Sequence, residues 1–174
     1  MNDKKYYSDF NAQTYQTRLL NYRNDVENRF RAYVASSGYL CRFLHLNAVS
    51  DTESYGESII KNFSKLPTLI KSFPDAFVYA PEKSEKEDQF FVELKNATFE
   101  QGKIISKIKL RDIKRYCLFE QTFTNKWTRF TICYPLKDGK MIFKSIDQML
   151  RLISKSELKK FPNDGIEYFE IQLN

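Results

Sequence analysis

The stretch 73–95 constrains the fold of this chain most, because two short apolar runs flank a charged connector. The first run reads FPDAFVYA, the connector PEKSEKEDQ and the second run FFVELK. Alternating runs of this length on either side of a polar turn are typical of a β-hairpin. Since side chains alternate along a strand, Asp75 is expected on the face of Phe77, and Glu93 on the face of Lys95. The hairpin therefore gathers two carboxylates and a lysine at the ends of its strands.

Length and charge indicate a folded protein with a slight basic excess. The chain has 174 residues, which suits a single domain over 1–174 with one sizeable core. A net charge of +6 permits a nucleic-acid partner without requiring one. No apolar run reaches the length of a membrane span, and the N-terminus has no apolar signal region. We therefore expect a cytoplasmic protein with no membrane partner.

Several kinds of site are excluded by composition. His45 is the single histidine, so a histidine metal cluster is not expected. Cys41, Cys117 and Cys133 lie in apolar runs at spacings that fit no zinc pattern, which favours free thiols. With 5 glycines and no glycine-rich phosphate loop, the chain is not expected to use a nucleotide cofactor.

The remaining elements follow from apolar periodicity and from turn signals. Helical spacing over 110–122 places Tyr116 on an apolar stripe, and Asp138-Gly139 predicts a tight turn. We expect the following elements in chain order: a loose arm over 1–13, a helix over 16–35 that ends at Gly38, a strand over 39–47, an insertion or flap over 49–72, the hairpin, a helix over 110–122, a strand over 127–134, a return strand over 141–144, a helix over 146–154 capped by Ser145, and a closing turn with an edge strand over 161–174.

The two hairpin carboxylates form a candidate site for a hard divalent cation. Mg²⁺ prefers oxygen ligands and commonly uses one or two carboxylates with several waters. Asp75 and Glu93 provide such a pair, and the backbone carbonyl of Leu94 adds a third candidate oxygen, with Mn²⁺ as a possible substitute for Mg²⁺. Lys95 can orient a water or stabilise charge on a phosphate. The combination suits phosphodiester hydrolysis.

Basic residues follow the hairpin closely and admit two interpretations. They form either the solvated face of an amphipathic element or a phosphate-contacting surface beside the carboxylates. The candidates for nucleic-acid contact are Arg42, Gln101, Lys103, Lys107, Lys109, Arg111, Lys114 and Arg115.

Pro74-Asp75 followed by Glu93-Leu94-Lys95 resembles the signature of the PD-(D/E)xK nuclease superfamily. The resemblance implies a restriction-endonuclease-like core, that is, an α/β fold in which helices flank a central mixed β-sheet. It also implies that a glutamate of the first helix completes the metal site, and Glu27 occupies the matching place. By periodicity alone, Glu27 borders the apolar stripe of that helix and would be an ordinary exposed carboxylate. Glu53 and Glu57 are the competing candidates for an extra acidic ligand.

Within the superfamily, the layout is similar to that of RecU-type and phage Holliday-junction resolvases. That resemblance implies DNA as the partner, four-way junctions as a substrate, a homodimer, and a bacterial or phage-encoded protein. Two alternatives stay open. One is a restriction-type or other phage or mobile-element endonuclease that acts on duplex DNA, and the other is a non-catalytic DNA-binding or assembly protein with the same fold.

Overall fold

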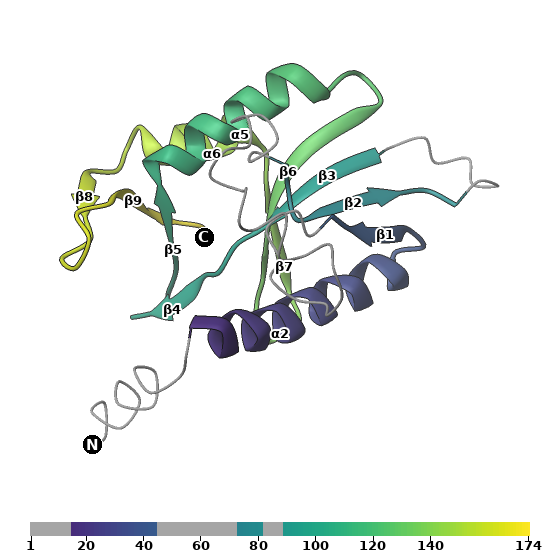
Figure 1. Ribbon diagram of the computed structural model, residues 1–174, viewed down its shortest axis with the longest axis horizontal. Helices are drawn as coiled ribbons and strands as arrows, with labels where there is room; N and C mark the ends of the chain where they lie inside the picture. The colour runs from purple at the N-terminus through teal and green to yellow at the C-terminus, as the bar shows by residue number, and fades with distance from the viewer. Residues whose placement is uncertain (1–14, 45–72, 82–88) are drawn as a thin grey trace.

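The computed structural model describes residues 15–44, 73–81 and 89–174, with side chains described from residue 25 onward (Figure 1). The chain forms a mixed α/β fold with a five-stranded and a four-stranded sheet. In chain order the elements are α2 (Tyr15–Ser36), β1 (Leu40–Phe43), β2 (Ala76–Tyr79), β3 (Gln89–Leu94), β4 (Thr98–Glu100), β5 (Lys103–Lys109), α5 (Leu110–Phe123), β6 (Thr128–Pro135), β7 (Met141–Lys144), α6 (Ile146–Ile153), β8 (Leu158–Lys160) and β9 (Glu167–Gln172).

The predicted hairpin forms the middle of the five-stranded sheet, whose strand order is β1-β2-β3-β6-β7. Strands β2 and β3 are antiparallel, with Phe77 opposite Phe91. Strands β3 and β6 are parallel, and the other neighbours in this sheet are antiparallel, so the central sheet is mixed as expected. The crossover between β3 and β6 contains α5, which is the usual way to connect parallel strands.

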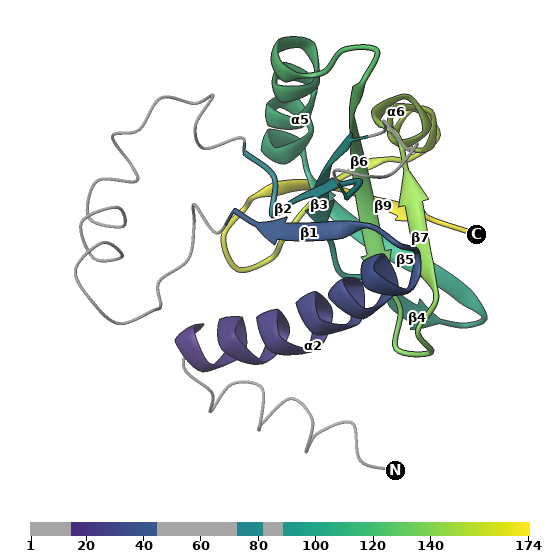
Figure 2. The same ribbon diagram turned by 90° about the vertical axis from the view of Figure 1, so that its right-hand side faces the viewer.

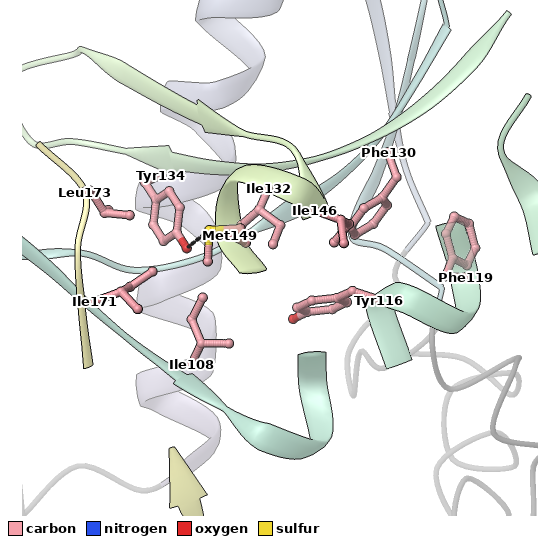
Figure 3. Close-up of a cluster of buried hydrophobic side chains, with 10 residues drawn as sticks. All are labelled: Ile108, Tyr116, Phe119, Phe130, Ile132, Tyr134, Ile146, Met149, Ile171 and Leu173. Atoms are coloured by element: carbon pink, nitrogen blue, oxygen red, sulfur yellow. Dashed lines mark hydrogen bonds between the residues drawn. The ribbon is translucent and has the colours of Figure 1, made fainter. Parts of the chain in front are cut away.

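Helices cover both faces of this sheet (Figures 1 and 2). Helix α2 packs on one face through a cluster that includes Val26, Phe30 and Val34. Helices α5 and α6 pack on the other face, where Tyr116 and Met149 belong to a second cluster shown in Figure 3. The flanked mixed sheet therefore matches the predicted fold class.

Local signals in the sequence define the helix ends. After α2, the N–H of Tyr39 donates to the carbonyl of Val34 at 3.1 Å and that of Gly38 to the carbonyl of Ala35 at 3.0 Å. This is a Schellman ending, and it requires the left-handed φ of 76° that Gly38 adopts. Ser145 begins α6 with a capping box, because its hydroxyl accepts from the N–H of Gln148 while that side chain accepts from the N–H of Ser145.

The second sheet corrects the sequence prediction. Its strand order is β4-β5-β9-β8, so β9 lies between two neighbours and is not the edge strand that we expected over 161–174. Strand β8 forms the edge instead. Strands β4 and β8 are only three residues long, too short for alternation to be distinguished from a loop.

Other predictions are confirmed in part or lie outside the described residues. Strand β1 ends at Phe43, earlier than predicted, although the N–H of Leu44 still donates to the carbonyl of Asp75 at 2.8 Å. The predicted arm over 1–13, the insertion over 49–72, and His45 lie outside the described residues. The three cysteines are free thiols, as predicted. Among the described residues, no helix has both the length and the hydropathy needed to cross a membrane.

Candidate active site

Asp75 and Glu93 lie across the hairpin from each other. The register pairs Phe77 with Phe91 and Ala76 with Val92, so one step further the strands bring Asp75 opposite Glu93 on the face that α5 covers. Burial and the neighbouring charge of Glu93 raise the pKa of Asp75 well above its usual value, against the opposing effects of Lys95 and of a backbone hydrogen bond. A bound cation at this pair would therefore favour the form in which both carboxylates are ionised.

The backbone N–H of Leu94 donates to Oδ2 of Asp75 at 2.8 Å and fixes this carboxylate against the end of β3. This contact arises because Leu94 is the last residue of β3, beside the position where the chain enters β2. A metal-binding role for the carbonyl of Leu94 stays a prediction.

Lys95 connects β3 to α5. Its Nζ lies 2.9 Å from Oε1 of Glu93 and 3.6 Å from Oδ2 of Asp112. Its backbone N–H donates to the carbonyl of Cys133 at 2.9 Å, which extends the parallel pairing of β3 with β6 and holds the residue in place. Burial acts to lower the pKa of Lys95, but the three surrounding carboxylates outweigh burial and raise it. Lys95 is therefore a cation and a hydrogen-bond donor, not a base.

Two residues of α5 complete the site, and sequence reasoning missed both roles. The hydroxyl of Tyr116 donates to Oε1 of Glu93 at 2.7 Å. Burial and the nearby carboxylates raise the pKa of Tyr116 well above its usual value, so the phenol keeps its proton. Asp112, in the first turn of α5, is buried and forms an ion pair with Arg115 as well as with Lys95. The spacing of 112 and 116 on one helical face was the available signal, but Tyr116 also fits an apolar stripe.

Glu27 lies near the pair without being shown to join it. Its side chain is half-buried on α2, and its charge adds to the effects that raise the pKa of Asp75 and of Cys41. The competing candidates Glu53 and Glu57 lie outside the described residues. Within the ranges that the structure describes, no group of three or more His, Cys, Asp or Glu side chains is close enough to hold a metal ion.

The hydrogen bonds at the carboxylates use one oxygen of each. Oδ2 of Asp75 accepts from Leu94, and Oε1 of Glu93 accepts from Tyr116 and contacts Lys95. As far as the described residues are concerned, Oδ1 of Asp75 and Oε2 of Glu93 are left for another ligand. Such a donor set suits Mg²⁺, which needs only one or two carboxylates when waters complete its coordination.

The predicted nucleic-acid contacts are distributed over several elements. Lys103, Lys107 and Lys109 belong to β5 of the second sheet, and not to a helix. Gln101 lies in the turn before β5, with a positive φ of 49°, and Arg42 is exposed on β1. On α5, Arg111 and Lys114 are exposed, whereas Arg115 is half-buried against Asp112. The structure thus distributes this set over β1, the turn before β5, β5 itself and the first half of α5.

Comparisons with known proteins identify similar folds but no family. No protein-family model matches the chain, and no curated protein matches its sequence. Among solved structures, the chain is similar to Hjc, a Holliday junction resolvase from the archaeal hyperthermophile Archaeoglobus fulgidus, at 10% identity and a TM-score of 0.45, over 84% of this chain and 80% of that one. It is also similar to D212, a nuclease from a fusselovirus, at 14% identity and a TM-score of 0.41, over 91% of this chain and 81% of that one. At these levels the likenesses carry no argument about activity, which depends on the side chains of the site.

Proposed function

We propose that this protein is a divalent-metal-dependent endonuclease that hydrolyses phosphodiester bonds in DNA. Asp75 and Glu93 hold Mg²⁺, or Mn²⁺ in its place, and Lys95 acts on the reacting phosphate. The observation that carries the proposal is the opposition of two carboxylates across a hairpin, with a protonated lysine 2.9 Å from one of them.

The donor set fits a hard cation. Burial and the charge of Glu93 disfavour the ionised form of Asp75, and a bound cation would reverse that balance. One oxygen of each carboxylate is already fixed by a protein donor, so the remaining oxygens are oriented before a ligand binds. The carbonyl of Leu94 and the carboxylate of Glu27 are the candidates for additional oxygen ligands.

The chain's own residues supply positioning and charge. When bound, the cation would polarise the phosphate and make an adjacent water more acidic. Lys95 keeps its proton, so it donates hydrogen bonds to a phosphate oxygen or to the attacking water and stabilises the negative charge that develops there. Asp112 holds the ammonium from the side of α5, and Tyr116 holds Glu93 in the orientation that Lys95 requires.

Branched DNA is the substrate to test first, because the sequence resembles junction resolvases in the order Glu27, Pro74-Asp75, Glu93-Leu94-Lys95. A homodimer is part of this proposal, since two sites could cut a four-way junction symmetrically. Duplex DNA is the alternative substrate of the same chemistry.

A cleavage assay with labelled four-way junction and matched linear duplex tests the proposal. We expect Mg²⁺-dependent cutting of the junction by the wild type and loss of cutting in Asp75→Asn, with paired symmetric nicks if the protein acts as a resolvase. Exposed Asp138→Asn is the matched control, because it removes the same charge from a turn outside the site. Cutting of the duplex alone would favour the restriction-type alternative. Binding of DNA without cutting in Mg²⁺ or Mn²⁺ would contradict the nuclease proposal and favour the alternative of a non-catalytic DNA-binding protein.

A further inference from the structure

The four-stranded sheet has one covered face and one outer face. Paired residues project from the same side of a sheet, so Ile108 and Phe169 share a face, as do Ser106 and Ile171. Ile108 and Ile171 are buried in the core cluster that α5 and α6 join, and Figure 3 shows both side chains within it. The alternate residues of β5 and β9 therefore lie on the outer face.

Lysines dominate this outer face. Lys107 is paired with Glu170, and Tyr168 is paired with Lys109 on one side and with Lys159 on the other. Lys103 shares the face by alternation along β5. Glu100 is paired with Lys103 on this face, and Ile105 is paired with Gln172. We define the outer lysine face by its charged residues and its tyrosine: Glu100, Lys103, Lys107, Lys109, Lys159, Tyr168 and Glu170.

An aromatic base supports the lysines. The ring of Tyr168 is buried and stacks on Phe161, with 4.1 Å between the ring centroids. Nζ of Lys107 lies over the ring of Tyr168 at 5.8 Å. Glu170 lies 2.9 Å from Nζ of Lys159 and 3.8 Å from that of Lys107, so one carboxylate connects both ammonium groups. These contacts orient the lysines without removing them from solvent, because their side chains are 46% exposed for Lys107 and 45% for Lys159.

The chain leads directly from the outer lysine face to the candidate active site. Strand β5 ends at Lys109, and α5 begins at the next residue, as Figure 1 shows. Two residues after Lys109, Arg111 is 64% exposed, and the following residue is Asp112, which contacts Lys95. Positive side chains thus lead from the second sheet to the edge of the site.

We propose that the outer lysine face binds the sugar–phosphate backbone of duplex DNA beside the point of cleavage, an inference that rests on the proposed function. The lysines on this face outnumber its two carboxylates, Glu100 and Glu170, which gives it the positive charge that a phosphate backbone requires. From Lys103 to Lys109, β5 extends roughly 20 Å, the length of duplex axis over which one strand advances by about six phosphates at ~3.4 Å of axial rise each. The contacts are with phosphates and carry no base preference.

Salt-dependent binding of a labelled 30-base-pair duplex tests this inference, with EDTA present so that the proposed metal-dependent cleavage does not occur. The test variant combines Lys103→Gln, Lys107→Gln and Lys109→Gln. The control variant combines Lys126→Gln, Lys137→Gln and Lys140→Gln, which removes the same charge from exposed positions outside this face. We expect the test variant to lose about 10-fold or more in affinity, and its plot of log affinity against log salt to become shallower by about 2 to 3, since each lost contact contributes ~0.9. The control should stay within about twofold of the wild type.

A double variant that keeps Lys109, the residue before α5, guards against loss of folding and should show about two thirds of the slope change of the test variant. Equal losses in the test and control variants, or an unchanged slope in the test variant, would overturn the proposal. Binding to phosphatidylserine vesicles that depends on these lysines, together with unchanged DNA binding, would also overturn it. If the wild type binds DNA through this face but never cleaves it, the nuclease proposal is wrong and the proposal that this face binds DNA is still supported. If the wild type cleaves DNA and the test variant binds DNA normally, only the proposed DNA-binding role of this face is wrong.

Discussion

Both faces of the central sheet bury apolar clusters, but among the described residues only the face under α5 also buries carboxylates. Under α2, the sheet packs through aliphatic and aromatic groups such as Phe30 and Val78. Under α5, the same hairpin buries Glu93, and α5 itself buries Asp112. Burial of apolar groups stabilises the fold, whereas burial of charges costs free energy unless they are paired. Apolar packing on both faces thus stabilises the hairpin, and this stability offsets the cost of holding carboxylates close together on the α5 face.

The largest effect on function should come from Lys95→Met, which keeps the apolar stem and removes the charge. We expect single-turnover cleavage to fall by about 10³-fold, since a preorganised charge at the reacting phosphate stabilises the transition state strongly. Lys140→Met, at a side chain that is 80% exposed, is the control and should cleave like the wild type. Cleavage within about tenfold of the wild type would mean that Lys95 does not act on the phosphate.

A large effect on stability should come from the apolar cluster under α2. Phe30 is 1% exposed, and Phe30→Ala should lower the free energy of unfolding by about 3–5 kcal/mol because it leaves a cavity. Urea unfolding monitored by circular dichroism measures this change. At a temperature where the variant stays folded, cleavage per folded molecule should be unchanged. If Phe30→Ala unfolds like the wild type but cleaves poorly, the claim that this residue contributes to stability and not to cleavage would be wrong.

The metal-free protein should lose stability as the pH rises. The folded-state pKa of Asp75 is raised, so the stability linked to this group is complete below its unfolded value of 3.8 and is lost as the pH rises toward the raised value. Asp75→Asn retains an oxygen that can accept from Leu94 and removes the titration. In EDTA, we therefore expect Asp75→Asn to have a higher melting temperature than the wild type at pH 8 and a smaller difference at pH 5. A wild type that is the more stable protein at pH 8 would contradict the raised pKa.

The smallest effect should come from Tyr116→Phe, which removes one hydrogen bond to Glu93 and keeps the ring. A hydrogen bond to a charged group contributes about 1.5–3 kcal/mol, so cleavage should fall by about 10-fold and the unfolding free energy by a similar energy. The Mg²⁺ concentration that gives half-maximal cleavage should be compared between the variant and the wild type. It should be higher in the variant if Tyr116 acts by positioning Glu93, because a displaced Glu93 weakens metal binding. If the Mg²⁺ dependence stays unchanged while cleavage falls about 10³-fold, Tyr116 acts on the substrate instead of on Glu93.

The hairpin and its charged residues could be predicted because their signals are local. Alternation assigned Asp75 to the face of Phe77 and Glu93 to the face of Lys95 within their own strands, and the register, which pairs Phe77 with Phe91, shows that the two carboxylates share one face. The ends of α2 and α6 were also predictable, since Gly38 and Ser145 act within one helical turn.

Features that depend on distant contacts could not be predicted. Tyr116 fits an apolar stripe, and only the packing of α5 on the hairpin shows that its hydroxyl reaches Glu93. The position of β9 inside a sheet depends on β8, a three-residue strand without a periodic signal, and on pairing with β5, which lies far away in the chain. For the same reason, the lysines of β5 were separable from those of α5 only once the second sheet was known.

Anomalous diffraction from crystals of the wild type and of Asp75→Asn grown with Mn²⁺ tests the proposed metal site most directly. We predict an Mn²⁺ peak between Oδ1 of Asp75 and Oε2 of Glu93 in the wild type, and a lost or weakened peak in the variant. A wild-type crystal with no peak between these oxygens at saturating Mn²⁺, or with a peak only elsewhere on the molecule, would contradict the assignment of Asp75 and Glu93 as metal ligands.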